Sequence, residues 1–305
     1  TMLQARGLGL GEHPELAALE HRDWVVDIHR QYAQAGSQIL CANTFGANRE
    51  KLRRTGKTVA EVVPPSIDAA REGAAGNALV ALDIGPIGQL LEPTGSLRFE
   101  EAVNIFKEVV LAGVQAGADL VLIETMTDLA EVKACVLGAK QALKAAGVKL
   151  PLFVSLTFDE RGRLLTGADI AGTVAMLEGL GVTAVGLNCG HEPSALMENV
   201  RTLADCSSLP FFVQPNASLP VVIDGKTVFP TSPEDFAHDM VPMVQLGAWA
   251  LGGCCGTTPE HIAQLVHATR GCPIVSRETS PRCVISGRTQ SLSLDEGPFI
   301  IGERL

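Results

Sequence analysis

Three cysteines carry the strongest chemical signal in this chain of 305 residues. Cys254 and Cys255 are adjacent within the glycine-rich segment 252–256, and Cys189 ends an apolar run elsewhere in the chain. Thiolates bind soft and borderline metal ions well, and three of them without an evident fourth protein ligand suit a zinc ion that keeps one position open. Open coordination is typical of catalytic zinc sites, whereas structural sites are closed. The sequence therefore predicts a zinc site held by Cys189, Cys254 and Cys255.

The type of ligand indicates the type of reaction. A zinc ion held by three thiolates has a net negative charge and is a weak Lewis acid toward water. It suits a fourth, incoming thiol, which would be held as the nucleophilic thiolate. A free thiol, with a pKa of about 8.5, is mostly protonated at neutral pH. We therefore expect activation of a substrate thiol for alkyl transfer rather than hydrolysis.

Short apolar runs at seven places along the chain predict strands that are covered on both faces. They lie at residues 38–45, 78–84, 119–124, 151–158, 182–188, 210–216 and 248–251. Between them lie stretches with the apolar spacing of helices, most clearly at residues 14–35, 99–116, 128–146 and 166–179. This alternation of strands and helices indicates βα units and a parallel sheet.

We interpret the chain as an α/β protein with a (β/α)8 TIM barrel. The alternative, an open doubly wound sheet, is disfavoured because no Gly-x-Gly-x-x-Gly motif follows the early strands. Seven strands are one short of a closed barrel, and the first strand is expected to be missing from the chain. The predicted barrel spans residues 1–277. Residues 278–305 are expected to form a linker toward a further domain.

Active groups in such barrels lie at the carboxyl ends of the strands. Cys189 and the Cys254–Cys255 pair are therefore expected on one rim, although they are far apart in sequence. Glu124 follows four apolar residues and either caps the next helix or points into the pocket. We favour the pocket, because a ligand ammonium would offset the cost of burying this carboxylate. Asp128 is the better candidate for the first turn of the following helix.

Other residues near the strand ends are weaker candidates. Phe45 is expected to form a wall of the pocket, with ordinary core packing as the alternative. Asn43, Asn188 and Asn216 either bind a ligand or satisfy loop backbone groups. His191 is an alternative fourth metal ligand, which we disfavour because three thiolates suffice and its loop is expected to be exposed.

The remaining composition excludes several classes of function. Cys41, Cys135 and Cys206 are interpreted as small buried residues, and Cys272 and Cys283 lie away from the strand ends. Eight cysteines in a chain of this size are too sparse for a disulfide framework, which favours a reducing, cytoplasmic location. A net charge of −10 without a basic cluster argues against nucleic-acid binding. No apolar stretch approaches the roughly 20 residues that span a bilayer, so no membrane partner is expected.

Five motifs together resemble the homocysteine S-methyltransferase family, and within it the homocysteine-binding module of cobalamin-dependent methionine synthases. The motifs are Asn43-Thr-Phe-Gly-Ala-Asn48, Gly85-Pro86, Glu124-Thr125, Asn188-Cys189 and Gly252-Gly-Cys-Cys-Gly-Thr257. The resemblance extends to about Arg270. Residues 297–304 are similar to the start of the folate-binding barrel that follows this module. Members of the family carry an Asp-Gly-Ala-Met-Gly-like first strand before the segment with which this chain opens.

The resemblance implies the roles of several residues. Cys189, Cys254 and Cys255 would bind Zn²⁺, and the sulfur of homocysteine would complete the tetrahedron. Glu124 would contact the amino group of homocysteine. Phe45 and the turn at Asn216-Ala217 would line the amino-acid pocket. The methyl donor would be methylcobalamin on a separate module, recharged from methyltetrahydrofolate, so the expected partners are cobalamin-binding and folate-binding modules of a longer polypeptide.

Three alternatives stay open at this point. A member of the same family that uses betaine or S-methylmethionine as donor would need no cobalamin module. A zinc barrel without catalytic function would have closed coordination that homocysteine leaves unchanged. A phosphate-binding barrel enzyme would need a glycine-rich anion site after the last strands, where this chain has Cys254 and Cys255 instead.

Overall fold

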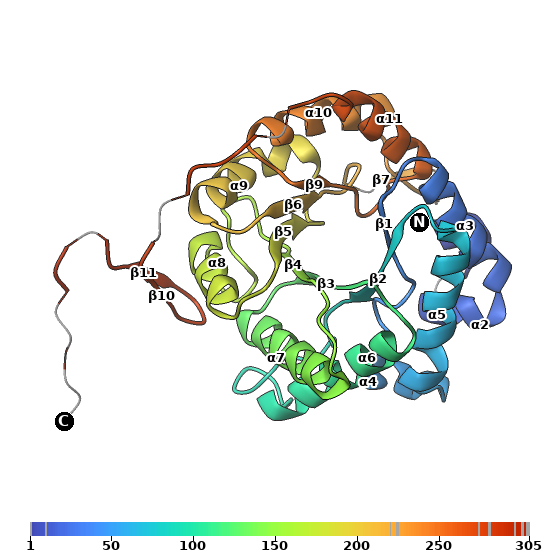
Figure 1. Ribbon diagram of the computed structural model, residues 1–305, viewed down its shortest axis with the longest axis horizontal. Helices are drawn as coiled ribbons and strands as arrows, with labels where there is room; N and C mark the ends of the chain where they lie inside the picture. Colours follow the sequence, from blue (N-terminus) through green and yellow to red (C-terminus); the bar gives the residue numbers. More distant parts are fainter. Residues whose placement is uncertain are drawn as a thin grey trace.

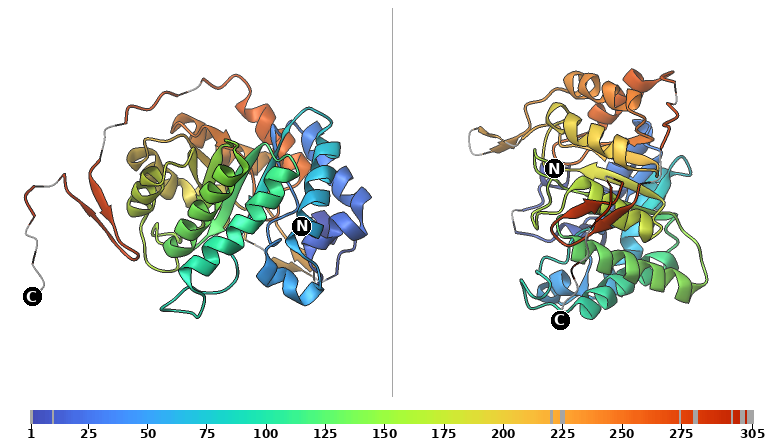
Figure 2. Two further views of the ribbon diagram at one scale, coloured as in Figure 1. Left: turned by 60° about the horizontal axis from the view of Figure 1, so that its bottom comes forward. Right: turned by 90° about the vertical axis from the view of Figure 1, so that its left-hand side faces the viewer.

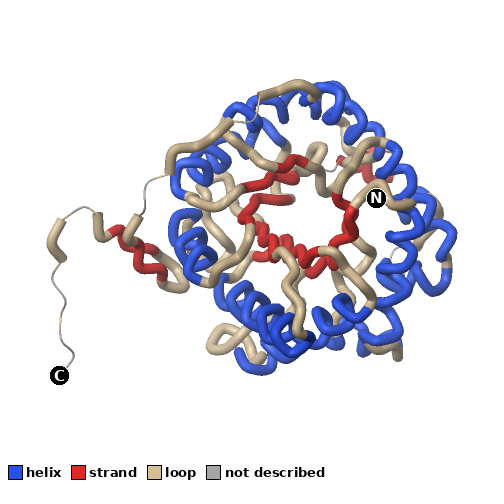
Figure 3. The backbone as a smooth tube through the Cα atoms, in the orientation of Figure 1, coloured by secondary structure: helices blue, strands red, loops and turns tan. Residues whose placement is uncertain are grey.

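A curled parallel sheet inside a ring of helices forms the body of the protein (Figure 1, Figure 3). We describe it from a computed structural model. The described residues are 2–9, 11–219, 221–223, 226–273, 275–279, 282–295, 297–299 and 302. No helix among them is long and apolar enough to cross a membrane.

The sheet has seven strands, all parallel, which neighbour one another in the order of the chain. They are β1 (Ile39–Cys41), β2 (Leu79–Ile84), β3 (Leu120–Met126), β4 (Leu152–Leu156), β5 (Ala184–Asn188), β6 (Phe211–Gln214) and β9 (Ala250–Leu251). In the described residues β1 and β9 form the two edges of the sheet. This is the (β/α)8 barrel that the sequence predicts, with seven strands in place of eight.

Apolar residues cover both faces of these strands, as expected for parallel strands. Leu122, Phe153 and Phe212 belong to a cluster inside the barrel. Val121 and Val154, one position along their strands, belong to the larger core between the sheet and the helices. Because side chains alternate across a strand, continuous apolar runs are required for a sheet buried in this way.

Longer helices surround the sheet (Figure 2), and the described part of the chain contains eight of them. They are α3 (Arg22–Gln34), α5 (Val59–Ala74), α6 (Phe99–Gln115), α7 (Leu129–Ala146), α8 (Ile170–Gly179), α9 (Pro193–Cys206), α10 (Pro233–Gln245) and α11 (Pro259–Thr269). Short helical segments are α1 (Met2–Ala5), η1 (Pro14–Leu16), α2 (Ala17–Glu20), α4 (Arg49–Leu52) and η2 (Arg53–Thr55). Asp128 and Asp169 are the N-caps of α7 and α8, so Asp128 has the capping role expected of it.

The structure differs from the sequence-based expectation in three places. The single helix predicted over residues 14–35 is broken into η1, α2 and α3, because His21 adopts a non-helical conformation with φ −138° and ψ 49°. Helix α5 was not singled out, and it contains Pro64 and Pro65, which remove two helical hydrogen bonds. A small hairpin, β7 (Val221–Ile223) with β8 (Lys226–Val228), lies within the connection between β6 and α10.

A second hairpin, β10 (Val284–Ser286) with β11 (Ser291–Ser293), packs beside α8. Arg288, in its turn, pairs with the Asp128 carboxylate at 2.8 Å. The hydroxyl of Ser291 donates to Asp169 at 2.9 Å. Since both aspartates begin helices that follow strands, the hairpin contacts the rim at the carboxyl ends of the strands. The boundary near residue 277 and the folate-binding barrel beyond it stay predictions.

Candidate functional site

The three cysteines singled out in the sequence meet at one point of the barrel rim. Cys189 directly follows β5, and Cys254 and Cys255 lie in the loop after β9. Their three Sγ atoms all lie within 4.8 Å of one another, and those of Cys189 and Cys255 are 4.0 Å apart. Tetrahedral zinc with bonds of about 2.3 Å places its sulfur ligands about 3.8 Å apart. The thiols therefore fit a zinc ion with little movement.

Backbone hydrogen bonds hold Cys189, and the loop after β9 that contains Cys254 and Cys255 (the thiol loop), against β6 and the residues after it. The amide of Cys189 donates to the Gln214 carbonyl at 3.0 Å, and the amide of Cys254 donates to the Pro215 carbonyl at 2.8 Å. The loop also needs glycine at 253, since a Cβ there would lie 2.3 Å from the Thr257 side chain. The thiols are thus placed by the barrel rather than by a flexible surface loop.

The thiols interact strongly with one another. Hydrogen bonds from Cys254 and Cys255 lower the pKa of the Cys189 thiol, and the contact with Cys189 raises the pKa of the Cys254 thiol. One negative charge is therefore stabilised within the cluster. Ionising the other thiols at these distances would require a cation among them. The electrostatics of the cluster thus agree with its geometry in fitting a metal ion.

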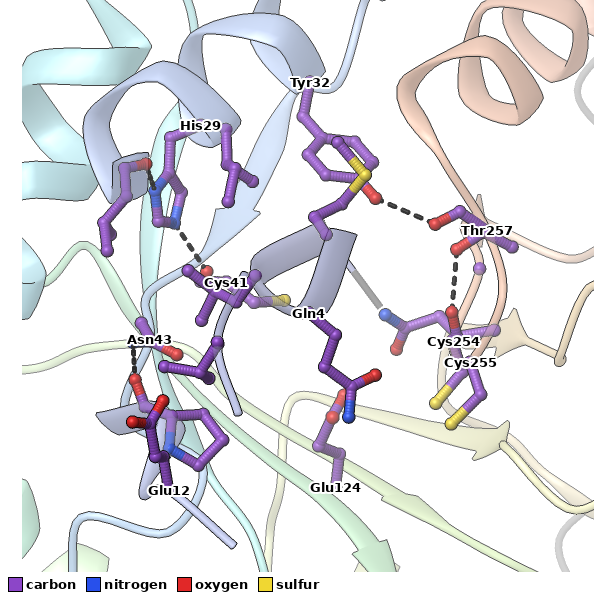
Figure 4. A pocket seen from close by; sticks show the side chains of 18 of the residues that line it. Gln4, Glu12, His29, Tyr32, Cys41, Asn43, Glu124, Cys254, Cys255 and Thr257 are labelled. Carbon is purple, nitrogen blue, oxygen red and sulfur yellow. Dashed lines mark hydrogen bonds between the residues drawn. The ribbon is translucent and has the colours of Figure 1, made fainter. Parts of the chain in front are cut away.

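A cavity of about 490 Å³ lies beside the thiols. Figure 4 shows Glu124, Cys254 and Cys255 around it, together with Gln4 and Glu12 from the amino-terminal region. Glu12 and Glu124 are the carboxylates of its described lining, which also contains His29 but no lysine or arginine. The cavity is therefore suited to a ligand with a cationic group.

Glu124 is a partly buried carboxylate of this cavity. It lies on β3, and burial raises its pKa to about 7, with a further contribution from the negative charge of Cys189. Partial burial of a carboxylate without a cationic partner is costly, and a ligand ammonium beside it would offset that cost. The structure therefore brings Glu124 and the thiols to one cavity, from strands that the sequence separates widely.

Other candidates lie around the site rather than in its cavity. The Phe45 ring packs under the Lys51 ammonium, whose Nζ is 5.1 Å from the ring centroid, and Phe45 is not among the lining residues. Asn216 accepts a hydrogen bond from the Cys255 amide at 3.2 Å, and the amide of Ala217 donates to the Cys255 carbonyl at 2.9 Å. Asn216 and Ala217 therefore support the thiol loop from behind.

The structure also places Asn43 and His191. Asn43 lines the cavity, but its side chain donates to the Pro14 carbonyl at 2.6 Å. The His191 Nδ1 lies 4.0 Å from a carboxylate oxygen of Glu160, and His191 is not part of the metal-ligand cluster found among the described residues. The disfavoured interpretation of His191 as a fourth ligand thus gains no support.

Several cavity residues were missed in the sequence. Gln214 ends β6 and lines the cavity, and its buried Oε1 has no hydrogen-bond partner among the described residues. Its position at a strand end was the signal that would have found it. Gln4, Glu12 and Tyr32 come from the amino-terminal helical region, where no strand end marks them. The Tyr32 hydroxyl donates to the Thr257 carbonyl at 2.9 Å and so joins α3 to the thiol loop.

One carboxylate near the rim should make stability depend on pH. Glu131 is 5% exposed and accepts a hydrogen bond from the Ile87 amide at 2.7 Å, and burial raises its pKa to about 7. Its folded-state pKa exceeds its unfolded value, so the folded state binds more protons and stability falls as pH rises through roughly 4.5 to 7. Glu131→Gln keeps the acceptor and removes the charge. Its free energy of unfolding should therefore fall less between pH 5 and 8 than that of the wild type, by at most about 3 kcal/mol.

Urea denaturation at the two pH values measures this difference. Glu101→Gln, an exposed change on α6, is the control and should behave as the wild type does. The same pH dependence in wild type and Glu131→Gln would contradict the prediction.

Fold and site together define a parallel α/β barrel with a cluster of three thiols at the rim formed by the carboxyl ends of its strands. A model of the family described as homocysteine S-methyltransferase matches residues 1–269. The chain therefore belongs to the homocysteine S-methyltransferase family, which confirms the resemblance noted in the sequence.

Relatives and solved structures agree with this assignment. The chain is 33% identical over 302 residues to methionine synthase of Mycobacterium leprae, a match that covers 92% of the chain and 25% of that protein. It is 30% identical over 325 residues to methionine synthase of Mycobacterium tuberculosis, covering 100% of the chain and 27% of that protein. The chain thus spans about a quarter of the length of these relatives.

The fold is similar to that of the homocysteine methyltransferase MmuM from Escherichia coli. Its oxidized form matches with a TM-score of 0.72 and 25% identity, covering 87% of this chain and 91% of that one. Its metallated form matches with a TM-score of 0.68 over the same shares of the two chains.

Proposed function

We propose that this chain binds homocysteine and activates its thiol for methylation to methionine. The observation that carries the proposal is the cluster of Cys189, Cys254 and Cys255, with Sγ atoms within 4.8 Å of one another, beside a cavity that contains Glu124. The three thiolates would hold Zn²⁺. Zinc bound there would supply Lewis acidity that lowers the pKa of an incoming thiol.

The residues of the chain divide the recognition of the amino acid between them. The Glu124 carboxylate would receive the ammonium group, and the free Oε1 of Gln214 offers a second acceptor in the same cavity. Apolar side chains of Leu3, Val25 and Ile28 line the cavity as well and would exclude water from the reacting sulfur. The thiol proton leaves to solvent as the substrate binds, so no separate general base is required.

The methyl donor is proposed from the relatives. Both are methionine synthases about four times as long as this chain, which leaves room for other modules in those proteins. We propose methylcobalamin on a separate module, recharged from methyltetrahydrofolate on another, as the source of the methyl group. The partners would then be cobalamin-binding and folate-binding modules of a longer polypeptide.

A second candidate uses betaine or S-methylmethionine as the donor. The similarity to MmuM favours it, because the match with this chain covers 91% of the MmuM chain. A homocysteine methyltransferase can thus have about the size of this chain. Methionine formation by the isolated chain from either donor, without cobalamin, would select this candidate.

X-ray absorption at the zinc edge tests the proposed function directly. The zinc-loaded protein should show three sulfur neighbours, and L-homocysteine should raise this number to four. L-homoserine, which carries oxygen in place of sulfur, is the matched control and should leave three. A count of four sulfurs before addition, or no change on adding homocysteine, would instead support a zinc barrel without catalytic function.

A further inference from the structure

Asn188 lies between the end of β3, which carries Glu124, and the thiol cluster. It is the last residue of β5, directly before Cys189, and it is 1% exposed. A buried carboxamide must satisfy both its acceptor and its donors, so its partners show which groups it holds in place. Among the described residues, its side-chain hydrogen bonds lead to residues of the site or to the strand beside it.

The first group that Asn188 holds is Thr125, the residue after Glu124. The Thr125 amide donates to the Asn188 Oδ1 at 2.9 Å, and the Asn188 Nδ2 donates to the Thr125 Oγ1 at 2.7 Å. Thr125 has a φ of +59°, a left-handed conformation that a β-branched residue adopts only when its surroundings enforce it. Two hydrogen bonds from one carboxamide enforce it here. They also fix the direction of the backbone that carries the Glu124 carboxylate.

The second group is the thiol cluster. The Asn188 Nδ2 lies 4.0 Å from the Cys254 Sγ, at the long end of an N–H···S contact. The next residue, Cys189, has a φ of +61°, so the backbone bends sharply at the ligand itself. The Ser155 hydroxyl donates to the Asn188 Oδ1 at 2.8 Å and holds the carboxamide from the β4 side. One rigid amide therefore contacts both the strand end that bears Glu124 and one of the thiols.

We propose that Asn188 is a positioning residue that couples recognition of the amino group to recognition of the thiol. The inference rests on the proposed function, because it assigns the ammonium to Glu124 and the sulfur to the thiol cluster. Its carboxamide sets the distance between these two points, so an amino acid with both groups binds more tightly than the separate contributions would give. Supporting hydrogen bonds of this kind around metal sites affect affinity about 10- to 100-fold.

Asn188→Asp is the variant that isolates this role. It keeps the acceptor for the Thr125 amide and the Ser155 hydroxyl, and it removes the two N–H donations. It also adds a negative charge near the thiols, which by itself would strengthen zinc binding. Weaker zinc binding in the variant can therefore be attributed to the lost donors. Asn199→Asp is the matched control. Asn199 lies on α9, is 3% exposed, and its side chain donates a hydrogen bond to the Asp159 carbonyl at 2.9 Å.

Three measurements are made on wild type, Asn188→Asp and Asn199→Asp. They are the zinc affinity by chelator competition, the homocysteine Kd by calorimetry, and the absorption spectrum of the cobalt(II)-substituted protein with and without homocysteine. We expect Asn188→Asp to bind zinc and homocysteine about tenfold more weakly and to change the sulfur-to-cobalt band. Asn199→Asp should match the wild type in all three.

Thr125→Val adds a second variant, which removes the hydrogen bond between Asn188 and Thr125 from its acceptor side and leaves Asn188 in place. Both substitutions remove the same hydrogen bond, so their effects on the homocysteine Kd should not add in the double variant. Additive effects, or unchanged affinities and spectrum in Asn188→Asp, would overturn the coupling role while the proposed function stands. If homocysteine left the spectrum of the cobalt(II)-substituted wild type unchanged, the proposed function itself would be overturned. The inference about Asn188 would then be overturned as well.

Discussion

Replacing Cys255 by serine should abolish stoichiometric zinc binding, which the wild type should show at one equivalent per chain. Structural zinc sites with four ligands bind with about 10–16 kcal/mol, or roughly 3–4 kcal/mol for each ligand. Losing one of three thiolates should therefore weaken zinc binding by about two to three orders of magnitude. Cys189 and Cys254 should behave alike, because all three Sγ atoms belong to one cluster.

Cys283→Ser is the matched control for this experiment. Cys255 and Cys283 are both exposed free thiols, but Cys283 lies before β10 and outside the cluster. Zinc content after dialysis against a weak chelator, measured by atomic emission, distinguishes the two variants. Full zinc occupancy in Cys255→Ser, or an equal loss in Cys283→Ser, would mean that the cluster does not hold the metal.

Glu124→Gln should weaken the binding of homocysteine about ten- to 150-fold while leaving zinc in place. The substitution keeps the size of the side chain and removes the charge that the ammonium would pair with. A hydrogen bond to a charged group contributes about 1.5–3 kcal/mol, which corresponds to this change in Kd. Calorimetry with L-homocysteine on the zinc-loaded protein measures it.

A second ligand and a second variant make this test specific. 4-Mercaptobutanoate, which is homocysteine without its amino group, should bind Glu124→Gln at least as well as it binds the wild type. Glu12→Gln changes the other carboxylate of the cavity, which already accepts a hydrogen bond from the Gly9 amide at 2.7 Å. If Glu12→Gln carried the loss and Glu124→Gln did not, the ammonium would be assigned to the wrong carboxylate.

The fold and the thiol cluster could be predicted because both follow from local patterns. Continuous apolar runs mark buried parallel strands, and the rule that strand ends meet at one rim then brings Cys189 to Cys254 and Cys255. No tertiary detail is needed for either step. Glu124, which lines the cavity, was singled out in the same way, as a charge at the end of an apolar run, and its role stays a prediction.

The lining of the cavity could not be predicted to the same extent. Gln4 and Tyr32 reach it because the amino-terminal helices pack across the rim, and packing of this kind has no sequence period. Phe45, whose role stays a prediction, illustrates the effect of packing. It follows a strand, but Gly85 leaves room for its ring beside the neighbouring strand, where it packs away from the cavity lining. Strand ends thus predict which residues are near the site, and side-chain packing decides which of them face it.

The hydrogen bond from Tyr32 to the Thr257 carbonyl joins residues 225 positions apart in the chain. Contacts of such long range carry a large loop-closure entropy, and they form only after the intervening units have folded. We therefore expect the thiol loop to be completed late during folding, when the first helices meet the last strand. A metal ion that binds the three assembled thiols would therefore bind only after the first helices have packed against the last strand. By mass action it would stabilise the complete fold relative to partly folded forms.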